Sequence, residues 1–433
     1  MRRVLVVGAG VAGLAAAEEA ASSGAKVVLL ESTNSFAPNR GMMPFLLSGA
    51  CSLKDIRSPD RVDLAERSGF RVSFGQNVRS VDTAARSLVA LGPGSSSEKL
   101  PFDALILATG SSPLPEVARG TSKPGVFPLS DPDDFAGLAG SVQRFSRIAL
   151  AGSSAALALV TAEQLSSSLR VVLLLEGSAL ERFSPVIRRR VLDAATERGV
   201  EVVEGGLHSV VGVRKVEAVM SPAGLHPCDA VAILPRRSPS LPEVACQRGQ
   251  SGGALVDRSM RTSADGVYAA GDCAELGVGS GSISLLLQSS AAVMGRTAGR
   301  NSAGGRIAEA GVAGSFGFKV FGVEICAAGI TAKEGVALGI DAIEVEDEGG
   351  GRNSADAKPF AASMVFERKS QRVYGIQLAG EGSLDLSSYI STIVASRASL
   401  EEVASQEAAY NPLADDKALP IRLTAGRIMK RVR

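Results

Sequence analysis

The chain has 433 residues, of which 45% are hydrophobic and 48 are glycine, and its formal net charge is +1. This length exceeds one ordinary hydrophobic core, so the sequence predicts two or three domains. Near-neutral charge, the lack of Trp and a 4% aromatic content argue against a nucleic-acid-binding protein. No apolar run reaches the roughly 18–20 residues that a membrane span requires.

Cysteine and histidine content limits the chemistry further. The five cysteines form no Cys-x-x-Cys pair and their number is odd. A disulfide framework is therefore not expected, and a reducing cytoplasm is the predicted location. The two histidines, His208 and His226, give little material for a metal site or a catalytic triad, so we predict no metal centre.

The N-terminal residues carry the pattern of a βαβ unit. Residues 4–7 read as a strand, 12–23 as a helix and 26–30 as a second strand that closes on Glu31. The turn and helix start hold the small residues Gly8, Ala9, Gly10, Ala12 and Gly13. Such glycines let a dinucleotide pyrophosphate reach the N–H groups of a helix start, and Glu31 is spaced to accept hydrogen bonds from a ribose hydroxyl.

A second βαβ pattern follows further along the chain. A buried strand over 102–107 ends in a small-residue turn made of Ala108, Thr109 and Gly110. Strands over 147–150 and 170–175 then flank a helix over 155–166, and Glu176 ends the second of these strands. The sequence thus predicts two related dinucleotide folds.

Further elements close the first fold and add a third region. Strands are expected over 200–203 and 230–234, the segment over 262–270 returns to the first domain, and a helix is expected over 284–301. Gly271 and Asp272 follow the segment over 262–270, where the carboxylate would accept hydrogen bonds from the ribityl hydroxyls of a flavin. Beyond about residue 314 the chain has its own expected elements, which are strands over 363–367 and 373–378 and helices over 387–396 and 400–404.

The segments GAGVAG, LILATGSSP and VYAAGDCAE, in this order, resemble the FAD-dependent pyridine nucleotide-disulfide oxidoreductase superfamily. The resemblance implies an α/β fold with two Rossmann-like domains and an α+β C-terminal domain. The FAD domain would span 1–113 and 245–313, an inserted NAD(P)H-binding-like domain 114–244, and a C-terminal interface domain 314–433. The implied FAD contacts are Gly8, Ala9, Gly10, Ala12, Gly13, Glu31, Arg40, Ala108, Thr109, Gly110, Gly271 and Asp272.

The segment over 37–49 distinguishes the branches of this superfamily. Disulfide-reducing branches carry a redox cysteine where this chain has Arg40. The segment is instead similar to that of NADH:rubredoxin reductases and of the flavin part of NAD(P)H nitrite reductases. Arg40 is the candidate catalytic residue, because a guanidinium near the ring or the pyrophosphate would stabilise negative charge. A surface loop residue is the alternative for Arg40, and Cys51 is expected to be a packed small residue rather than a displaced thiol.

The turn of the second βαβ unit departs from the family pattern. Within 151–156, two of the three glycine positions hold Ala or Ser, and residues 233–236 (ILPR) replace the usual Ala-Thr-Gly. A Cβ at the second glycine position obstructs a pyrophosphate. Gly152 and Glu176 remain the candidate contacts for NAD(P)H, and Glu176 favours NADH over NADPH. A middle domain kept only as a scaffold is the alternative.

The sequence therefore predicts an FAD-dependent enzyme that moves electrons from NAD(P)H via flavin to an external acceptor, without a redox-active disulfide. The acceptor would be a small redox protein, a quinone-like compound or O2, and the enzyme a homodimer. A coenzyme A-disulfide reductase or NADH oxidase-like enzyme is one alternative, in which Tyr410 would face the partner subunit's site. An FAD-bearing subunit of a larger dehydrogenase with a decayed NAD site is the other. The basic residues over 427–433 are expected to form a solvated tail, with docking of an acidic carrier as the alternative.

Overall fold

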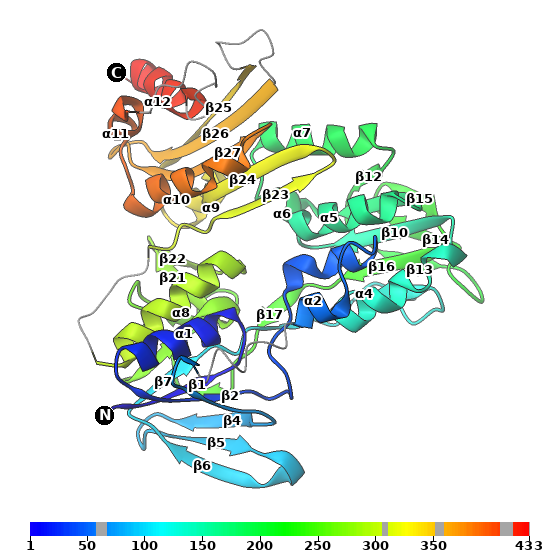
Figure 1. Ribbon diagram of the computed structural model, residues 1–433. Helices are drawn as coiled ribbons and strands as arrows, with labels where there is room; N and C mark the ends of the chain where they lie inside the picture. The colour runs from blue at the N-terminus through cyan, green and yellow to red at the C-terminus, as the bar shows by residue number, and fades with distance from the viewer. Residues whose placement is uncertain (58–66, 305–310, 351–358, 408–418, 433) are drawn as a thin grey trace. The chain divides into compact units, whose positions relative to one another are not determined.

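The structure is a computed structural model that describes residues 1–57, 67–304, 311–350, 359–407 and 419–432 (Figure 1). The chain divides into two compact units. The first contains residues 1–39, 54–113 and 237–314, and the second contains residues 40–53, 114–236 and 315–433.

A parallel sheet ordered β20-β7-β1-β2-β3 forms the centre of the first unit. Its strands are β1 (Arg3–Val7), β2 (Lys26–Leu30), β3 (Arg71–Ser73), β7 (Ala104–Leu107) and β20 (Val267–Ala269). The middle strands are almost continuously apolar and buried, as expected when both faces of a parallel sheet are covered. All four strand pairs are parallel.

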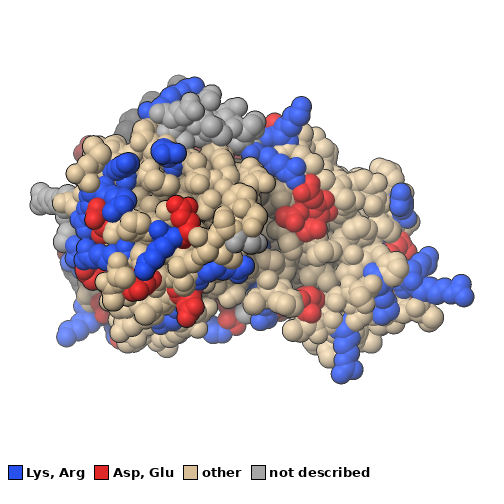
Figure 2. Space-filling model, turned by 90° about the horizontal axis from the view of Figure 1, so that it is seen from below, with Lys and Arg blue, Asp and Glu red and all other residues tan. Residues whose placement is uncertain are grey.

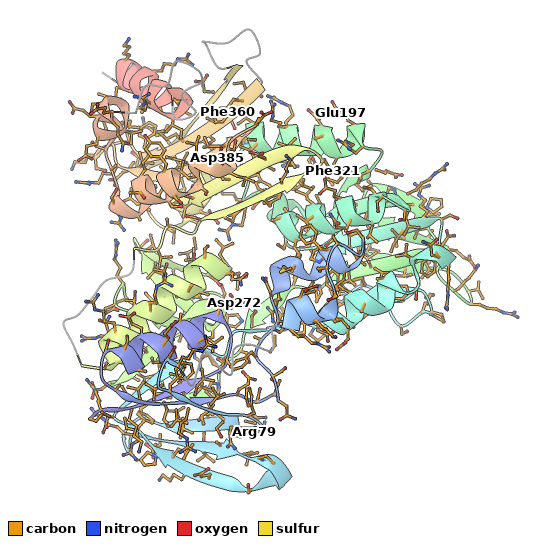
Figure 3. All side chains as sticks on the ribbon, viewed as in Figure 1. Arg79, Glu197, Asp272, Phe321, Phe360 and Asp385 are labelled. Atoms are coloured by element: carbon orange, nitrogen blue, oxygen red, sulfur yellow. The ribbon has the colours of Figure 1, made fainter. Side chains whose placement is uncertain are left out.

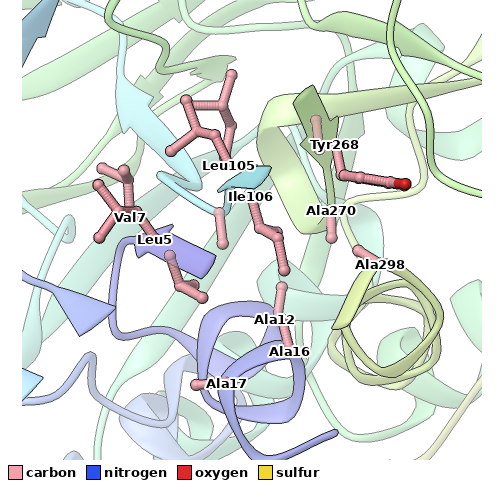
Figure 4. Packing of buried hydrophobic residues seen from close by; sticks show 14 of the residues in the cluster. Leu5, Val7, Ala12, Ala16, Ala17, Leu105, Ile106, Tyr268, Ala270 and Ala298 are labelled. Atoms are coloured by element: carbon pink, nitrogen blue, oxygen red, sulfur yellow. The ribbon is translucent and has the colours of Figure 1, made fainter. Parts of the chain in front are cut away.

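Two helices made of small residues pack together on this sheet (Figure 4). They are α1 (Val11–Ser22) and α8 (Gln288–Ser302). A Cβ at Gly295 would lie 2.2 Å from the Ala12 carbonyl oxygen, and one at Gly299 would lie 2.3 Å from the Ala16 carbonyl oxygen. The two helices therefore approach backbone to backbone, which fixes the start of α1 over the end of β1.

The remaining elements of the first unit are short. The antiparallel strands of β4 (Asn77–Asp82), β5 (Ser87–Leu91) and β6 (Ser97–Pro101) lie on the other side of the parallel sheet from α1 in Figure 1, and β18 (Glu243–Val244) extends them. The others are β8 (Ser111–Pro113), β17 (Arg237–Pro239), β19 (Ala254–Val256), β21 (Ala274–Val278), β22 (Gly281–Ile283), α2 (Leu53–Arg57), η2 (Pro93–Ser95) and η4 (Gly271–Cys273). β8 and β17 pair where the chain passes from one unit to the other.

A second parallel sheet, ordered β12-β11-β10-β16-β9, lies in the second unit. Its strands are β9 (Val126–Pro128), β10 (Arg147–Gly152), β11 (Arg170–Leu175), β12 (Glu201–Glu204) and β16 (Ala230–Leu234). Around it lie η1 (Arg40–Leu46), α4 (Pro132–Ala139), η3 (Val142–Arg144), α5 (Ala155–Ser166), α6 (Gly177–Leu180), α7 (Pro185–Glu197), and the small sheet of β13 (Ser209–Val211), β14 (Ala218–Ser221) and β15 (Gly224–Pro227).

An antiparallel sheet ordered β23-β24-β27-β26-β25 completes the second unit. Its elements are β23 (Phe316–Val320), β24 (Val323–Gly329), α9 (Ala332–Ala337), β25 (Ala342–Gly350), β26 (Pro359–Glu367), β27 (Val373–Ala379), η5 (Leu384–Leu386), α10 (Ser387–Ser396), α11 (Leu400–Ser405) and α12 (Leu419–Val432). Helix α7 joins this sheet to the parallel one, because it contacts β12 as well as β26 and β27. The buried Gln377 side chain accepts from Ser184 N and donates to the Arg182 carbonyl oxygen, each at 2.9 Å, at the start of α7.

The predicted fold class is confirmed, and one local expectation is wrong. Residues 427–432 are part of helix α12 and not a solvated tail, since Ile428 is buried and Arg427 binds Asp347 at 2.6 Å; Arg433 lies outside the described residues. The three-domain division stays a prediction, and Tyr410 lies outside the described residues.

Basic and acidic side chains both occur on the face drawn in Figure 2, with uncharged surface between them. This matches the net charge of +1. Within the described ranges, no helix combines the length and the apolar character needed to cross a membrane.

Candidate functional site

The glycine turn between β1 and α1 is held by backbone contacts. Gly8 has φ +104°, and a Cβ there would lie 2.3 Å from the Ala108 carbonyl oxygen. A Cβ at Gly13 would lie 1.8 Å from the Gly8 carbonyl oxygen. The packing of this unit therefore requires glycine at both positions, since no side chain fits.

Gly10 is different, because the protein's own packing does not require it. It caps α1 with an ordinary extended conformation (φ −77°, ψ −174°), and the nearest atom to an added Cβ is Ala37 Cβ at 3.9 Å. No side chain caps this helix start. Open space before N–H groups that lack a side-chain acceptor suits a phosphate, so the missing Cβ fits the approach of a pyrophosphate.

Glu31 ties the end of β2 to the glycine turn. Its side chain is buried, and Oε2 accepts from Ala9 N at 2.7 Å. Oε1 accepts from Thr33 N at 2.9 Å and from the Ser32 and Thr33 hydroxyls at 3.1 Å. Each carboxylate oxygen has two lone pairs, so Oε2 can accept a further hydrogen bond from a ribose hydroxyl. The arrangement places the acid beside the turn that would hold the pyrophosphate.

Asp272 is anchored close to the same helix start (Figure 3). Gly271 has φ +79°, and a Cβ there would lie 2.9 Å from Ala12 Cβ. The Ser111 hydroxyl donates to Asp272 Oδ2 at 2.9 Å, and Arg237 Nε donates to that hydroxyl at 3.0 Å. Asp272, Ser111 and Arg237 therefore form one network, and the sequence pattern had indicated only the first of them.

The turn after β7 shapes the neighbouring edge. Ala108 N continues the pairing with β1 by donating to the Val7 carbonyl oxygen. The Thr109 hydroxyl donates to the Ser240 carbonyl oxygen, and Gly110 has φ +70°. Ala108, Thr109 and Gly110 therefore line this side of the site mainly with backbone atoms. Together with Gly10, Glu31 and Asp272, they fit the two ends of an FAD molecule.

The second glycine turn has a register that the sequence assigned differently. β10 runs to Gly152 and Ser154 caps α5, as Gly8 follows β1 and Gly10 caps α1. Leu157, which lies outside the segment 151–156, therefore stands in the place of Gly13, so the third glycine position of this turn holds Leu. Ser154 is exposed and makes no side-chain cap. The N–H groups at the start of α5 thus remain open to a phosphate, although Ser154 carries a Cβ.

Glu176 caps the short helix α6 directly after β11, as the sequence predicts for an acid that binds a ribose. Its carboxylate is paired with Arg236. Arg236 Nε lies 3.3 Å from Glu176 Oε1, and Nη2 contacts Oε2. The side chain of Arg236 is 63% exposed and that of Glu176 27%. Glu176 raises the pKa of the Arg236 guanidinium through this hydrogen-bonded pair.

Comparison with known proteins decides the family. The family model described as pyridine nucleotide-disulphide oxidoreductase matches residues 2–295. The chain belongs to this family. It is thus an NAD(P)H oxidoreductase, and the cofactors of such flavoproteins, FAD and NAD(P)H, are the groups that the two turns would hold.

Three relatives of this oxidoreductase illustrate its range. An NADH oxidase of Methanocaldococcus jannaschii is 26% identical over 447 residues, which cover 99% of both proteins. The assimilatory nitrate reductase electron transfer subunit of Bacillus subtilis is 25% identical over 283 residues, which cover 63% of this chain and 36% of that protein. The solved structure of an NAD-dependent persulfide reductase from A. fulgidus matches with a TM-score of 0.86 and 23% identity, over 99% of this chain and 83% of that one.

Arg40 of the oxidoreductase belongs to the second unit. It opens η1, whose Met43 and Leu46 are buried and which packs against α4 and α5. The Ser48 hydroxyl bonds to Gln164 on α5. The segment that carries Arg40 is thus attached to the helix that starts at the second glycine turn. A role of Arg40 at the flavin stays a prediction.

Sequence reasoning missed Ser111 and Arg237, and it noted Arg236 only as a departure from the family pattern. A pair of arginines directly after the buried strand β16 was a usable signal, because strand ends in parallel sheets line ligand sites. Ser111 follows the ATG segment at the end of β7 in the same way. The partners of these residues were not predictable, since they lie 126 and 161 positions away in the chain.

Proposed function

We propose that this protein is an FAD-dependent oxidoreductase that passes electrons from NAD(P)H to an external acceptor without using a protein thiol. FAD would supply the redox chemistry. Gly10 and the start of α1 would hold its pyrophosphate, Glu31 its ribose and Asp272 its ribityl chain. Burial raises the thiol pKa of Cys228, Cys246, Cys273 and Cys326, and this observation supports a reaction that does not use a protein thiol.

Cys273 is adjacent to Asp272 but is not available as a nucleophile. It is fully buried, and its Sγ donates to the Leu107 carbonyl oxygen at 3.3 Å and to the Ala270 carbonyl oxygen at 3.4 Å. Burial raises the pKa of its thiol. A redox or nucleophilic cysteine needs a thiolate in a partly exposed, electropositive place. Cys273 instead fills the core beneath the site.

The other cysteines do not replace it. Burial raises the pKa of Cys246, that of Cys228 to about 11 and that of Cys326 to about 12. Cys51 is half-buried and its Sγ lies 3.5 Å from the Met42 carbonyl oxygen. It is the cysteine on which a coenzyme A-disulfide reductase would have to rely. The persulfide reductase among the structural relatives keeps this second candidate function open to test.

The acceptor class is tested together with Cys51. Purified wild type, Cys51→Ser and the matched control Cys246→Ser would be assayed for NADH and NADPH consumption with O2, a small iron–sulfur protein, a quinone and coenzyme A disulfide. We expect all three proteins to consume NAD(P)H at rates within about twofold of one another. A Cys51→Ser protein that alone loses reduction of coenzyme A disulfide would replace our proposal by the second candidate.

Assembly and location complete the proposal. A homodimer with a small redox protein as partner, working in the cytoplasm, accords with cysteines that form no disulfide and with the electron transfer subunit among the relatives. Sedimentation of the purified protein tests the dimer. Co-purification of a large partner chain would instead favour the FAD-bearing subunit of a larger dehydrogenase.

A further inference from the structure

An ion pair crosses the edge of the parallel sheet at the second glycine turn. In the sheet, β10 lies between β11 and β16. Glu176 follows β11 and Arg236 stands two residues beyond β16. Because the strands are parallel, their carboxyl ends meet at one edge, and the pair spans the turn that begins at Gly152.

The glutamate of this pair is held in place by its surroundings. A Cβ at Gly206 would lie 3.1 Å from Glu176 Cγ, so the stem of the glutamate packs against the space that this glycine leaves. Arg236 is anchored at its backbone, where its carbonyl oxygen accepts from Leu114 N at 2.7 Å. The guanidinium itself is the more exposed partner, with 63% of the side chain accessible.

The ion pair with Arg236 changes which nucleotides Glu176 can attract or repel. A bare glutamate at this place accepts hydrogen bonds from the 2′-hydroxyl of NADH and repels the 2′-phosphate of NADPH. Here the charges of Glu176 and Arg236 cancel. A guanidinium has five N–H donors in a planar fork that matches phosphate oxygens, and Glu176 takes those of Nε and Nη2. The two N–H groups of Nη1 could therefore donate to a second acceptor without loss of the pair.

We propose that Arg236 is a specificity residue that lets this site bind NADPH as well as NADH. The guanidinium neutralises Glu176 and donates to the 2′-phosphate, whereas the 2′-hydroxyl of NADH needs only the carboxylate. This inference rests on the proposed function in one respect, that a nicotinamide dinucleotide binds at this turn. It replaces the preference for NADH that the sequence alone predicts from Glu176.

The test measures binding of the oxidised nucleotides to the FAD-loaded protein by calorimetry, so that no turnover is involved. The variants are Arg236→Ala and the matched control Arg189→Ala. Arg189 on α7 forms an exposed ion pair with Glu348 on β25, and 61% and 53% of the two side chains are accessible. Its removal takes away the same charge without touching the turn at Gly152.

We expect Arg236→Ala to weaken NADP⁺ binding about 10- to 100-fold, the range of a hydrogen bond to a charged group. NAD⁺ binding should change less than about threefold, and Arg189→Ala should change neither. Glu176→Gln should tighten NADP⁺ binding by removing the remaining negative charge. The NADP⁺ affinity of wild type should also fall more steeply with added salt than the NAD⁺ affinity.

Other results overturn the inference and separate it from the proposed function. If Arg236→Ala weakens both nucleotides equally, or tightens both, the arginine serves or blocks the site as a whole and is not a specificity residue. If wild type binds NAD⁺ but not NADP⁺, the proposed function stands and this inference fails. If neither nucleotide binds the FAD-loaded protein, both fail together.

Discussion

Gly10→Ala should separate cofactor binding from folding. Gly10 has an extended conformation open to any residue, and an added Cβ would meet nothing closer than Ala37 Cβ at 3.9 Å. The methyl group would instead project into the space before the first N–H groups of α1. We therefore expect the substitution to exclude the pyrophosphate while the protein itself accommodates it.

The magnitudes follow from the same geometry. Alanine loses less conformational entropy on folding than glycine but is the poorer helix cap, so the unfolding free energy should change by less than about 1 kcal/mol. Displacing the pyrophosphate by a methyl group costs at least one hydrogen bond to a charged group, about 1.5–3 kcal/mol. FAD should therefore bind about 10- to 100-fold more weakly.

The matched control is Gly13→Ala, three residues further on. Its Cβ would lie 1.8 Å from the Gly8 carbonyl oxygen, so α1 would have to move off the sheet, at a cost of several kcal/mol. The assays are the FAD content after dialysis and the thermal unfolding of the FAD-free proteins by circular dichroism. Undiminished FAD binding by Gly10→Ala, or its apoprotein unfolding as easily as Gly13→Ala, would refute the assignment of Gly10 to the cofactor.

Three further predictions concern the network at Asp272 and the second unit. Arg237→Met removes the donor to Ser111, which orients Asp272. It should weaken FAD retention roughly two- to tenfold in dialysis; unchanged retention would exclude a part in this network. Gln377→Ala leaves Ser184 N and the Arg182 carbonyl oxygen without their partner and should lower the unfolding free energy in urea by about 1–3 kcal/mol. An unaltered urea midpoint would contradict this role. Burial raises the pKa of Glu344 above its ordinary 4.5, and Glu346 adds to the rise while a hydrogen bond from Ser363 opposes it. A carboxyl group whose pKa is raised by folding favours the folded state below 4.5 and loses that contribution as the pH rises through its folded pKa. Glu344→Gln should thus unfold at a higher temperature than wild type at pH 7, and the gap should shrink towards pH 4.5; a gap independent of pH would disprove the effect.

The sequence predicts the fold of this chain well because the informative signals are local. The residues of β1, the glycine turn and α1 are consecutive, and their spacing specifies a βαβ unit. The same holds for α5 and α10, whose predicted bounds match the structure. Helix α12 was not predicted from the sequence, because charged residues fill its exposed face. Its buried face includes the apolar residues Ile421 and Ile428, which are seven positions apart in the chain.

The site is less predictable, because its partners are distant in the chain. Glu31 and Asp272 stand at strand ends, so their type and place could be predicted. The pairing of Glu176 with Arg236 brings together residues 60 positions apart, and only the strand order of the sheet relates them. The start of α5 was predicted correctly, but the glycine positions of the turn before it were misassigned, because Ala and Ser fill this turn and leave no glycine spacing to align.

The central claim is that electrons pass between NAD(P)H and an external acceptor through FAD alone, without a protein thiol. An anaerobic titration of the purified protein with NADH or NADPH, followed at the flavin absorption band, tests this most directly. A flavin is a two-electron acceptor, so we predict complete bleaching with about one equivalent of nucleotide per FAD. A requirement for about two equivalents would reveal a second two-electron group such as a cysteine disulfide, and the lack of bleaching by either nucleotide would contradict the account as a whole.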